Sequence, residues 1–545
     1  MNRCGFVNKY TLCAFLMLLS GMLPACAAAT GCVPGAHVFC VTSSADDAID
    51  PAPGQGTGTL RQAIVDANAA GGADTIEFAI ANPPGPHTIA LTRALPAFNP
   101  NSVGSVVIDG YSQAGSVMNT NAPDQGGLNA QLMIELVGSG SYTGFTYPCC
   151  AAPYFNLTVQ GIAMHGFGSA IAGQQATLTP KAKLTVYGCF IGTTIDGSAL
   201  PSEGNSGAAV AVGYDDAQIG GAQAWQRNLL SGSAAGVYAS GPNASVIVEG
   251  NLIGTDAAGT QSIPNGTNSN WPGIVVAGNL PGIRLGCTGA GCLSAASRNV
   301  ISGNHTYGVG IWDSYSQILS GLQIKGNFIG TDWTGNAPLP NGDATAGCPT
   351  YCGGIQLQGS QSIAKPAALI GGFNPEEGNL IAYNNGAGIV SAFGHIGESF
   401  DNQANAIHNN RNTNVAFVLQ GRLPNDAGDA DTGTNNQQNW PVIQSASVSG
   451  GQLTVTYYVD SSSANSAYPL RVDFFVDVDE GSGAFLVSDI YPASSAQLAR
   501  TVSLPLPMDA QTPAGLVAAA TDANNYSSEL SPSYVFDRIF ASEFE

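Results

Sequence analysis

The middle of the chain alternates apolar and polar residues in short runs that end at glycine and asparagine. The runs at 184–193, 246–255 and 322–331 are alike, because each alternates, turns at a Gly-Asn or Gly-Cys pair and continues into an Ile-Gly-Thr element. A period of two predicts short strands whose Ile, Val and Leu side chains share one face. Glycine and asparagine suit the left-handed backbone at the corners between such strands.

These runs belong to a longer repeat. Its Ile-Gly-Thr elements recur at Ile191, Ile253 and Ile329, and Ile-Gly-Gly and Arg-Asn elements lie between them. This order predicts three coils of about 20–25 residues in each long repeat. The connections leave no room for crossover helices, so each strand is expected to pair in parallel with its counterpart in the next coil. We expect an all-β parallel β-helix with stacked aliphatic and asparagine ladders.

A helix is expected before the repeats. Thr59 is its expected N-cap and Gly71-Gly72 its stop. Such a helix would cover the first coil, whose open edge would otherwise recruit another strand. Its apolar positions fall at helical spacing: Leu60, Ala63, Ile64 and Ala67.

The repeat pattern fades after about residue 420. A polar, Asp- and Asn-rich linker follows, and then come alternating runs at 452–459, 470–476 and 516–521. Runs of this length and spacing predict a small antiparallel β-sandwich. The expected organisation is a signal peptide at 1–29, an N-terminal cap at 30–75, a parallel β-helix at 76–420, a linker at 421–441, a β-sandwich at 442–536 and a C-terminal tail at 537–545.

The first 29 residues have the pattern of an export signal. Arg3 and Lys9 precede an apolar run at 12–23, and small residues follow it. The sequence around Cys26 also resembles a lipoprotein box, although Pro24 fits it poorly, so both a free and a lipid-anchored form stay open. The apolar run is shorter than the ~20 residues of a membrane span. We expect an extracellular or outer-surface protein, with the periplasm as the alternative.

Composition narrows the choice of partners. Only 10% of residues are charged, 44% are apolar, and 70 of 545 are glycine, which suits a β fold with many tight turns. The net charge is −21, and removing Arg3 and Lys9 with the signal makes it −23. A charge of this sign argues against nucleic acid and anionic membranes, and it weakens the case for a polyanionic sugar.

Nine of the twelve cysteines lie outside the signal segment. Cys149, Cys150 and Cys189 are an odd set, and a bridge from Cys149 or Cys150 to Cys189 stays open. In an exported chain the remaining close pairs predict local disulfides. These pairs are Cys32 with Cys40, Cys287 with Cys292, and Cys348 with Cys352.

The segment at 58–64, Gly-Thr-Leu-Arg-Gln-Ala-Ile, resembles the N-terminal capping segment of exported bacterial right-handed parallel β-helix repeat proteins. Those segments share a Leu-Arg-(Glu/Gln)-Ala-Ile core. The Asn-x-Ile-Gly-Thr-Asp and Arg-Asn-x-Ile-Ser-Gly-Asn repeats and the segments at 425–442 and 520–529 are similar to the same proteins. The resemblance covers about residues 40–530 and implies a right-handed coil. It implies little about chemistry, because most such proteins have no assigned activity.

Five residues are candidates for catalysis. Asp256 and Asp332 follow Ile-Gly-Thr in two repeats, so they either line a carboxylate groove or bond their own turn backbone. Asp215 and Asp216 resemble the acid pair of β-helix pectin hydrolases, which would need carboxylates about 5–10 Å apart. Arg298 could serve a sugar lyase as a base, although its recurrence in register, with Arg at 227, favours a structural role.

Further residues suggest sugar or metal binding. Trp271, Trp312 and Trp333 lie in the repeats, where exposed indoles could stack on sugar rings. Trp225 and Tyr315 share this prospect. A later cluster is either a metal or acid–base site or a polar turn: His395, Glu398, Asp401 and His408.

The expected linker carries a pattern of acidic residues. Asp426, Asp429 and Asp431 stand beside Gly428 and Gly433 and resemble a calcium-binding turn. Calcium takes several oxygen ligands and favours such loops, but this one lacks the spacing and closing glutamate of an EF-hand. A plain solvated linker is the alternative.

These observations favour a non-catalytic surface protein that binds carbohydrate or mediates adhesion. The expected partner is a polysaccharide or cell-surface glycan. The alternative function is a polysaccharide-degrading enzyme, a glycoside hydrolase before a lyase, because acids are plentiful and bases scarce. Neither function requires a cofactor, and calcium is the one ion that the sequence suggests.

Overall fold

The computed structural model describes residues 31–536, with gaps at 82–83, 99–103, 148–154, 174–181, 214, 242–244, 278–281, 288–291, 293, 314–320, 344–347, 349–351, 360–367, 375, 392–399, 418–420 and 508–512. The described chain is nearly all β, with one α-helix, α1 (Leu60–Ala70). Several predictions lie outside the described residues: the signal at 1–29 with Cys26, Cys149, Cys150, Tyr315, His395, Glu398 and the tail at 537–545.

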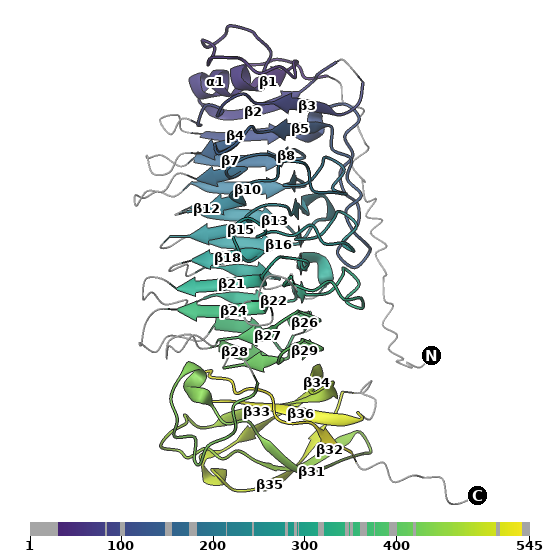
Figure 1. Ribbon diagram of the computed structural model, residues 1–545, viewed down its shortest axis with the longest axis vertical. Coiled ribbons are helices and arrows are strands. Elements are labelled where there is room, and N and C mark those ends of the chain that lie inside the picture. The colour runs from purple at the N-terminus through teal and green to yellow at the C-terminus, as the bar shows by residue number, and fades with distance from the viewer. Residues whose placement is uncertain are drawn as a thin grey trace, which may run out of the picture.

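Short strands form three long sheets in which each strand pairs in parallel with its counterpart one coil further along. Figure 1 shows these strands stacked along the long axis, with α1 at one end. The arrangement is consistent with a parallel β-helix and confirms the predicted parallel pairing. The strands β1 to β30 are called the coil.

Sheet 1 has eleven strands. They are β1 (Val38–Val41), β2 (Gly72–Phe78), β4 (Gly104–Asp109), β7 (Phe155–Gln160), β10 (Lys183–Tyr187), β13 (Asp216–Gly220), β16 (Val246–Glu249), β19 (Arg284–Gly286), β22 (Gln323–Lys325), β25 (Ala368–Gly371) and β28 (Phe400–Gln403).

Sheet 2 follows sheet 1 around each coil. Its coil strands are β3 (His87–Ala90), β5 (Ile134–Val137), β8 (Ala163–His165), β11 (Phe190–Ile191), β14 (Leu229–Leu230), β17 (Leu252–Ile253), β20 (Val300–Ile301), β23 (Phe328–Ile329), β26 (Leu380–Ala382) and β29 (Ala406–His408).

Sheet 3 has nine strands and completes each coil from the third strand of sheet 1 onward. They are β6 (Phe145–Tyr147), β9 (Ile171–Gly173), β12 (Ala208–Val212), β15 (Ala235–Ser240), β18 (Ile274–Ala277), β21 (Tyr307–Asp313), β24 (Gly353–Gly359), β27 (Ala387–Val390) and β30 (Val415–Ala416).

The strand register shows how many coils make one long repeat. Ile191 pairs with Leu230, Leu230 with Ile253, Ile253 with Ile301, and Ile301 with Ile329. Each long repeat therefore holds two coils, and the prediction of three is wrong. The reason is that each Ile-Gly-Gly element is the sheet 1 strand of the coil whose sheet 2 strand follows it, rather than a coil of its own.

The inside of the coil is apolar and continuous. Ile191, Ile253 and Ile329 are fully buried in one core that runs through the coil, as the alternation predicts. Two ladders of asparagine side chains line its corners. The ladder between sheets 1 and 2 comprises Asn228, Asn251, Asn299, Asn327, Asn379 and Asn405. The ladder between sheets 2 and 3 comprises Asn265, Asn304, Asn341, Asn384 and Asn410.

The helix α1 forms as the sequence predicts. The Thr59 hydroxyl accepts a hydrogen bond from the backbone N–H of Gln62, and Gly71 follows the last turn. Arg61 is fully buried, and its guanidinium donates to the carboxylates of Asp46 and Asp50. The Leu-Arg-Gln-Ala-Ile segment thus holds the loop before the helix through Arg61, and it also supplies apolar residues to the buried face of the helix.

Strands β31 (Val442–Ser449), β32 (Gln452–Tyr458) and β35 (Arg500–Pro505) form one antiparallel sheet. Strands β34 (Gly481–Tyr491), β33 (Leu470–Val478), β36 (Gly515–Thr521) and β37 (Tyr534–Val535) pair in that order as a second antiparallel arrangement. Side chains from both arrangements share a core that is separate from that of the coil. These seven strands are called the C-terminal unit, and Figure 1 shows them at the opposite end from α1.

The C-terminal unit is joined to the last coil. Ile407 of β29 pairs with Ser482 of β34, so sheet 2 continues into the unit. The guanidinium of Arg471 bridges Asp401 of the coil and Asp473 of its own strand, each over 2.8 Å. The connecting segment at 421–441 is packed rather than solvated, because Asn435 within it is fully buried.

Candidate functional site

The recurring aspartates of the repeats hold turns. The Oδ1 atom of Asp256 accepts hydrogen bonds from the backbone N–H groups of Thr260 and Gln261. The Oδ1 atom of Asp332 accepts from the Thr334 hydroxyl over 2.7 Å and from the backbone N–H of Ala337. Both aspartates are buried. Their bonding favours the turn role over a carboxylate groove.

Asp215 and Asp216 also bond the backbone. Oδ1 of Asp215 accepts from the N–H of Ala182 over 3.0 Å, and Oδ1 of Asp216 accepts from the N–H of Ser245 over 2.9 Å. Asp215 is 1% exposed. A catalytic acid pair must reach substrate, so this placement supports a structural role.

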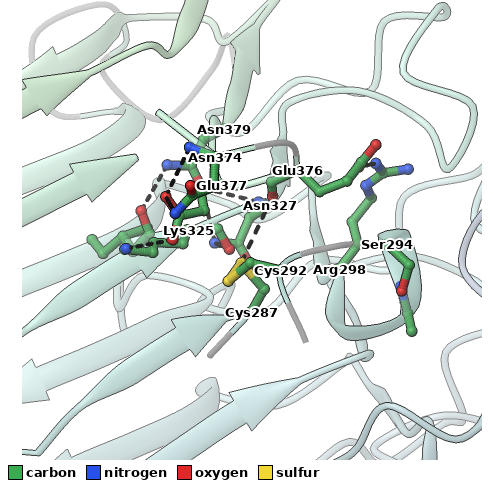
Figure 2. Close-up of a disulfide and its surroundings, with 12 residues drawn as sticks. Cys287, Cys292, Ser294, Arg298, Lys325, Asn327, Asn374, Glu376, Glu377 and Asn379 are labelled. Atoms are coloured by element: carbon green, nitrogen blue, oxygen red, sulfur yellow. Dashed lines mark hydrogen bonds and ion pairs between the residues drawn. A yellow bond between two sulfur atoms is a disulfide. The ribbon is translucent and has the colours of Figure 1, made fainter. Parts of the chain in front are cut away.

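Arg298 lies beside the Cys287–Cys292 disulfide, as Figure 2 shows. Its guanidinium pairs with Glu376 over 2.6 Å and lies 4.0 Å from the ring centroid of Phe328. Burial lowers the pKa of Arg298. Because two partners hold this side chain in place, a structural role for Arg298 is favoured over the role of a catalytic base.

Arg227, the counterpart of Arg298 two coils earlier, is 1% exposed. Its guanidinium donates to the backbone carbonyls of Asn121, Gly126 and Gly250. Burial lowers its pKa to about 10. Its contacts tie the loop at 119–129 to the coil and leave little access for a substrate.

The described members of the late acidic and histidine cluster do not meet as a site. Asp401 pairs with Arg471 of the C-terminal unit. The ring of His408 packs edge-on against Tyr383, and its Nδ1 lies 2.7 Å from Oδ1 of Asn409. Asp401 therefore joins two parts of the chain rather than facing a cavity with His408.

The structure brings two of the three predicted tryptophans together. Trp271 and Trp312 pack on one apolar patch on the outer face of sheet 3. Trp271 stacks on Tyr238 with ring centroids 5.0 Å apart. Trp333 belongs to a different cluster, over sheet 2, and Trp225 packs edge-on against Tyr187.

A pocket of about 310 Å³ lies at this patch and is called the aromatic pocket. Its lining includes Trp312, Gln356, Gln358, Asn270, Pro272 and Thr306. The Nε1 atom of Trp312 donates to Oε1 of Gln356 over 3.0 Å, which fixes the indole. A Cβ atom on Gly310 would lie 2.5 Å from Cγ of Pro272 and 3.1 Å from Nε1 of Trp312, so only glycine leaves room for the ring here.

A second pocket, of about 340 Å³, lies at the corner between sheets 2 and 3 and is called the polar pocket. Its lining includes His305, Asp343, Asn385, Ser262 and Thr267. The Nδ1 atom of His305 lies 3.8 Å from Oδ2 of Asp343. Sequence reasoning missed this pair. The sequence does contain one indication of the pair, because each of the two residues closely follows an asparagine of the second ladder.

The three acidic side chains of the expected calcium turn do converge. Ligand atoms of Asp426, Asp429 and Asp431 all lie within 4.8 Å of one another. Asp429 is already bonded, because Oδ1 accepts from the N–H of Asn439 and Oδ2 from the Ser461 hydroxyl. Among the described atoms, the buried Oδ1 of Asp431 has no hydrogen-bond partner. Burial, together with the two neighbouring carboxylates, raises the pKa of Asp431 to about 6.

No protein-family model and no curated protein sequence matches this chain. The two pockets and the acidic turn are therefore the features from which a function can be assigned. Trp312 and Gln356 lie on the paired strands β21 and β24, and a site built on strands is expected to be preformed.

The cysteines agree with the sequence prediction where they are described. The three predicted disulfides are formed: Cys32–Cys40, Cys287–Cys292 and Cys348–Cys352. Cys189 is free and buried, so it bridges neither Cys149 nor Cys150. Burial raises the pKa of the Cys189 thiol to about 12, which makes it inert. Within the described residues, no helix has the length and apolar character needed to cross a membrane.

Proposed function

We propose that this is an exported, extracellular or cell-surface protein that binds neutral carbohydrate at the aromatic pocket without cleaving it. The observation that carries the proposal is the Trp312 indole, fixed beside Gln356 and Gly310 on the outer face of sheet 3. Adhesion to a glycan-coated surface would follow from such binding.

The chemistry of the pocket suits a sugar. An indole offers an apolar face to the C–H face of a pyranose ring. The exposed amides of Gln358 and Asn270 offer both donors and acceptors to hydroxyl groups. The net charge of −21 disfavours acidic glycans, so the expected ligand is neutral.

A binding role is supported over hydrolysis by the state of the acidic candidates. Asp256 and Asp332 hold turns, and Asp215 and Asp216 bond the backbone. A glycosidase needs two carboxyl groups facing a bond across about 5–10 Å. A glycoside hydrolase is the weaker candidate, because Asp343 is the one carboxylate among the described lining residues of the two pockets.

Export is supported by the disulfides. Three local bridges among the described residues are compatible with an oxidising compartment, where such bonds persist. We place the protein outside the cell or on its outer surface.

The proposal extends to the hand of the coil, the role of α1 and the fold of the C-terminal unit. We infer a right-handed coil, because parallel strand connections are right-handed in about 98% of cases. The helix α1 packs on β1 and β2 and serves as the N-terminal cap. The two antiparallel arrangements around a shared core are interpreted as a β-sandwich.

We also propose that the turn at Asp426, Asp429 and Asp431 binds calcium. The converging ligand atoms and the unpartnered Oδ1 of Asp431 support a hard cation with oxygen ligands. The bound ion would hold the connecting segment between the coil and the C-terminal unit. This role is structural, and glycan binding does not depend on it.

The test of glycan binding uses purified protein lacking residues 1–29 and a panel of neutral and acidic polysaccharides. Retention on a neutral glycan without new reducing ends or unsaturated products is the expected result. The variant Trp312→Ala should weaken retention at least about tenfold, whereas the matched control Trp333→Ala should not. New reducing ends would overturn the binding-only function and favour the hydrolase. Equal retention by Trp312→Ala would refute the aromatic pocket as the site.

A further inference from the structure

The aromatic pocket and the polar pocket adjoin. His305 lines the polar pocket and the next residue, Thr306, lines the aromatic pocket. The loop at 264–272 lines both pockets as well, since Thr267 belongs to one and Asn270 to the other. The hydroxyl of Thr306 donates to the backbone carbonyl of Asn270, which fixes the two segments side by side.

Gly266 lies within the loop at 264–272, which contributes residues to both pockets. A Cβ atom at Gly266 would lie 2.2 Å from the backbone oxygen of Trp271 and 3.5 Å from Cβ of His305. The backbone here has a φ of 91°, which a side chain rarely adopts. The chain therefore passes between the backbone of Trp271 and His305 with no side chain of its own, which lets the loop at 264–272 lie close against His305.

The side chains of the polar pocket complement those of the aromatic pocket. Asp343 is 46% exposed at its side chain and His305 17%, so both can meet a ligand. The backbone N–H of Asp343 donates to the carbonyl of His305, which holds the two residues together. The side-chain amide of Asn385, which also lines this pocket, donates to the carbonyl of Gly342.

We propose that the two pockets are one groove that binds a linear neutral oligosaccharide, with an apolar subsite at Trp312 and a polar, hydroxyl-reading subsite at His305 and Asp343. This inference rests on the proposed carbohydrate binding and adds the length and polarity of the ligand. Each pocket alone is at the small end of ligand sites, so a chain that fills both gains from both.

The polar subsite selects hydroxyl groups rather than acidic groups. A carboxylate accepts two hydrogen bonds from neighbouring sugar hydroxyls, and an imidazole adds a donor or an acceptor. A uronate or sulfate at this position would meet the Asp343 carboxylate and be repelled. A metal-dependent site is a poorer fit, because the only group of three or more metal-ligating side chains among the described residues is the acidic turn at 426–431.

The experiment measures the affinity of the purified protein for a series of oligosaccharides, from disaccharide to hexasaccharide, made from a neutral polysaccharide that the protein retains. The hexasaccharide should bind at least about tenfold more tightly than the disaccharide. His305→Gln and Asp343→Asn should remove most of that gain in affinity. Trp312→Ala should weaken both ligands. The control Asp124→Asn changes an exposed carboxylate outside both pockets and should change neither affinity.

Each outcome has a distinct meaning. Equal affinity across the series, or full hexasaccharide affinity in both polar variants while Trp312→Ala still weakens binding, would overturn the groove and leave the proposed function intact. No binding of any neutral glycan by the unaltered protein would overturn the proposed function and this inference with it. Unchanged melting curves of the conservative variants exclude misfolding as the cause of any loss.

Discussion

The side-chain nitrogen of Asn299 donates a hydrogen bond to the side-chain oxygen of Asn327 over 2.9 Å, in the middle of the first asparagine ladder. The same nitrogen donates to the carbonyl of Val248, and the side-chain oxygen of Asn299 accepts from the backbone N–H of Asn251. All of these groups are buried. The ladder therefore satisfies backbone groups at the corners that no strand pairing reaches.

We predict that Asn299→Ala lowers the free energy of unfolding by about 2–4 kcal/mol, because it leaves several buried polar groups without partners. Denaturation by urea, followed by circular dichroism, measures the change. Asn336→Ala is the control, since Asn336 lies on an exposed turn and should cost little. Equal stability of the two variants would mean that the ladder does not stabilise the coil.

Arg471 provides a test of the joint between the coil and the C-terminal unit. Its guanidinium pairs with Asp401 and with Asp473, which is fully buried. Burial raises the pKa of Asp473, so the pairing with Arg471 only partly offsets the cost of burying its charge. We predict that Arg471→Ala destabilises the protein by about 3–5 kcal/mol, because it leaves the carboxylates of Asp401 and Asp473 without their charged partner.

Thermal unfolding and limited proteolysis measure this effect. Cleavage should increase in the connecting segment at 421–441 before the coil itself is cut. Arg411→Ala removes an exposed arginine from the same coil and should leave both readouts unchanged. A loss of stability in the Arg411 variant that matches the loss in the Arg471 variant would argue against a specific joint.

Glu529 makes stability depend on pH. Its carboxylate accepts hydrogen bonds from the N–H groups of Phe417 and Leu423, and Arg422 is the charged group that lowers its pKa. Burial nevertheless raises that pKa from 4.5 to about 7. The folded state therefore binds the proton more tightly than the unfolded state, so stability is full below pH 4.5 and is lost as the pH rises to about 7.

The upper limit of this loss is about 3 kcal/mol. Because other carboxylates titrate in the opposite sense, the measurement compares the unaltered protein with Glu529→Gln between pH 4.5 and pH 8. The stability of the unaltered protein should fall relative to the variant across this interval. Parallel curves would show that Glu529 does not titrate with a raised pKa.

The sequence predicted those parts of the fold that depend on local periodicity. Alternation identified Ile191, Ile253 and Ile329 as buried, because in a strand every second side chain points to the same face. The helix after Thr59 and the three disulfides were also local signals. The number of coils in each long repeat could not be predicted from a local pattern. It depends on which strands pair, and loops of unequal length obscure that pairing in the sequence.

The candidate site was less accessible to sequence reasoning. Trp271 and Trp312 were predicted as sugar-stacking residues by type alone, and only the register of sheet 3 separates them from Trp333. His305 and Asp343 were missed, because the two residues lie in different coils and are related only by their places after the ladder residues Asn304 and Asn341. The packing of the connecting segment was missed because its polar residues, such as Asn435, find partners in both neighbouring parts of the chain.

The acidic turn makes the last prediction, which concerns calcium. Oδ1 of Asp429 accepts one backbone N–H, so a second lone pair on this oxygen is open to a cation, and Oδ1 of Asp431 has no partner among the described atoms. Calcium at about a hundred times its Kd should stabilise the folded protein by about 2.7 kcal/mol. The melting temperature should therefore rise with calcium and fall with a chelator.

A matched pair of variants locates the effect. Asp431→Asn removes a charge from the turn and should abolish the shift in melting temperature, whereas Asp124→Asn removes a distant exposed charge and should keep it. Magnesium should stabilise less, because it demands a tighter octahedral shell than three side chains on a short turn readily supply. A melting temperature that neither calcium nor chelator moves would rule out an ion at this turn. The hydrogen bonds of Asp429 to Ser461 and Asn439 would then be what holds the segment.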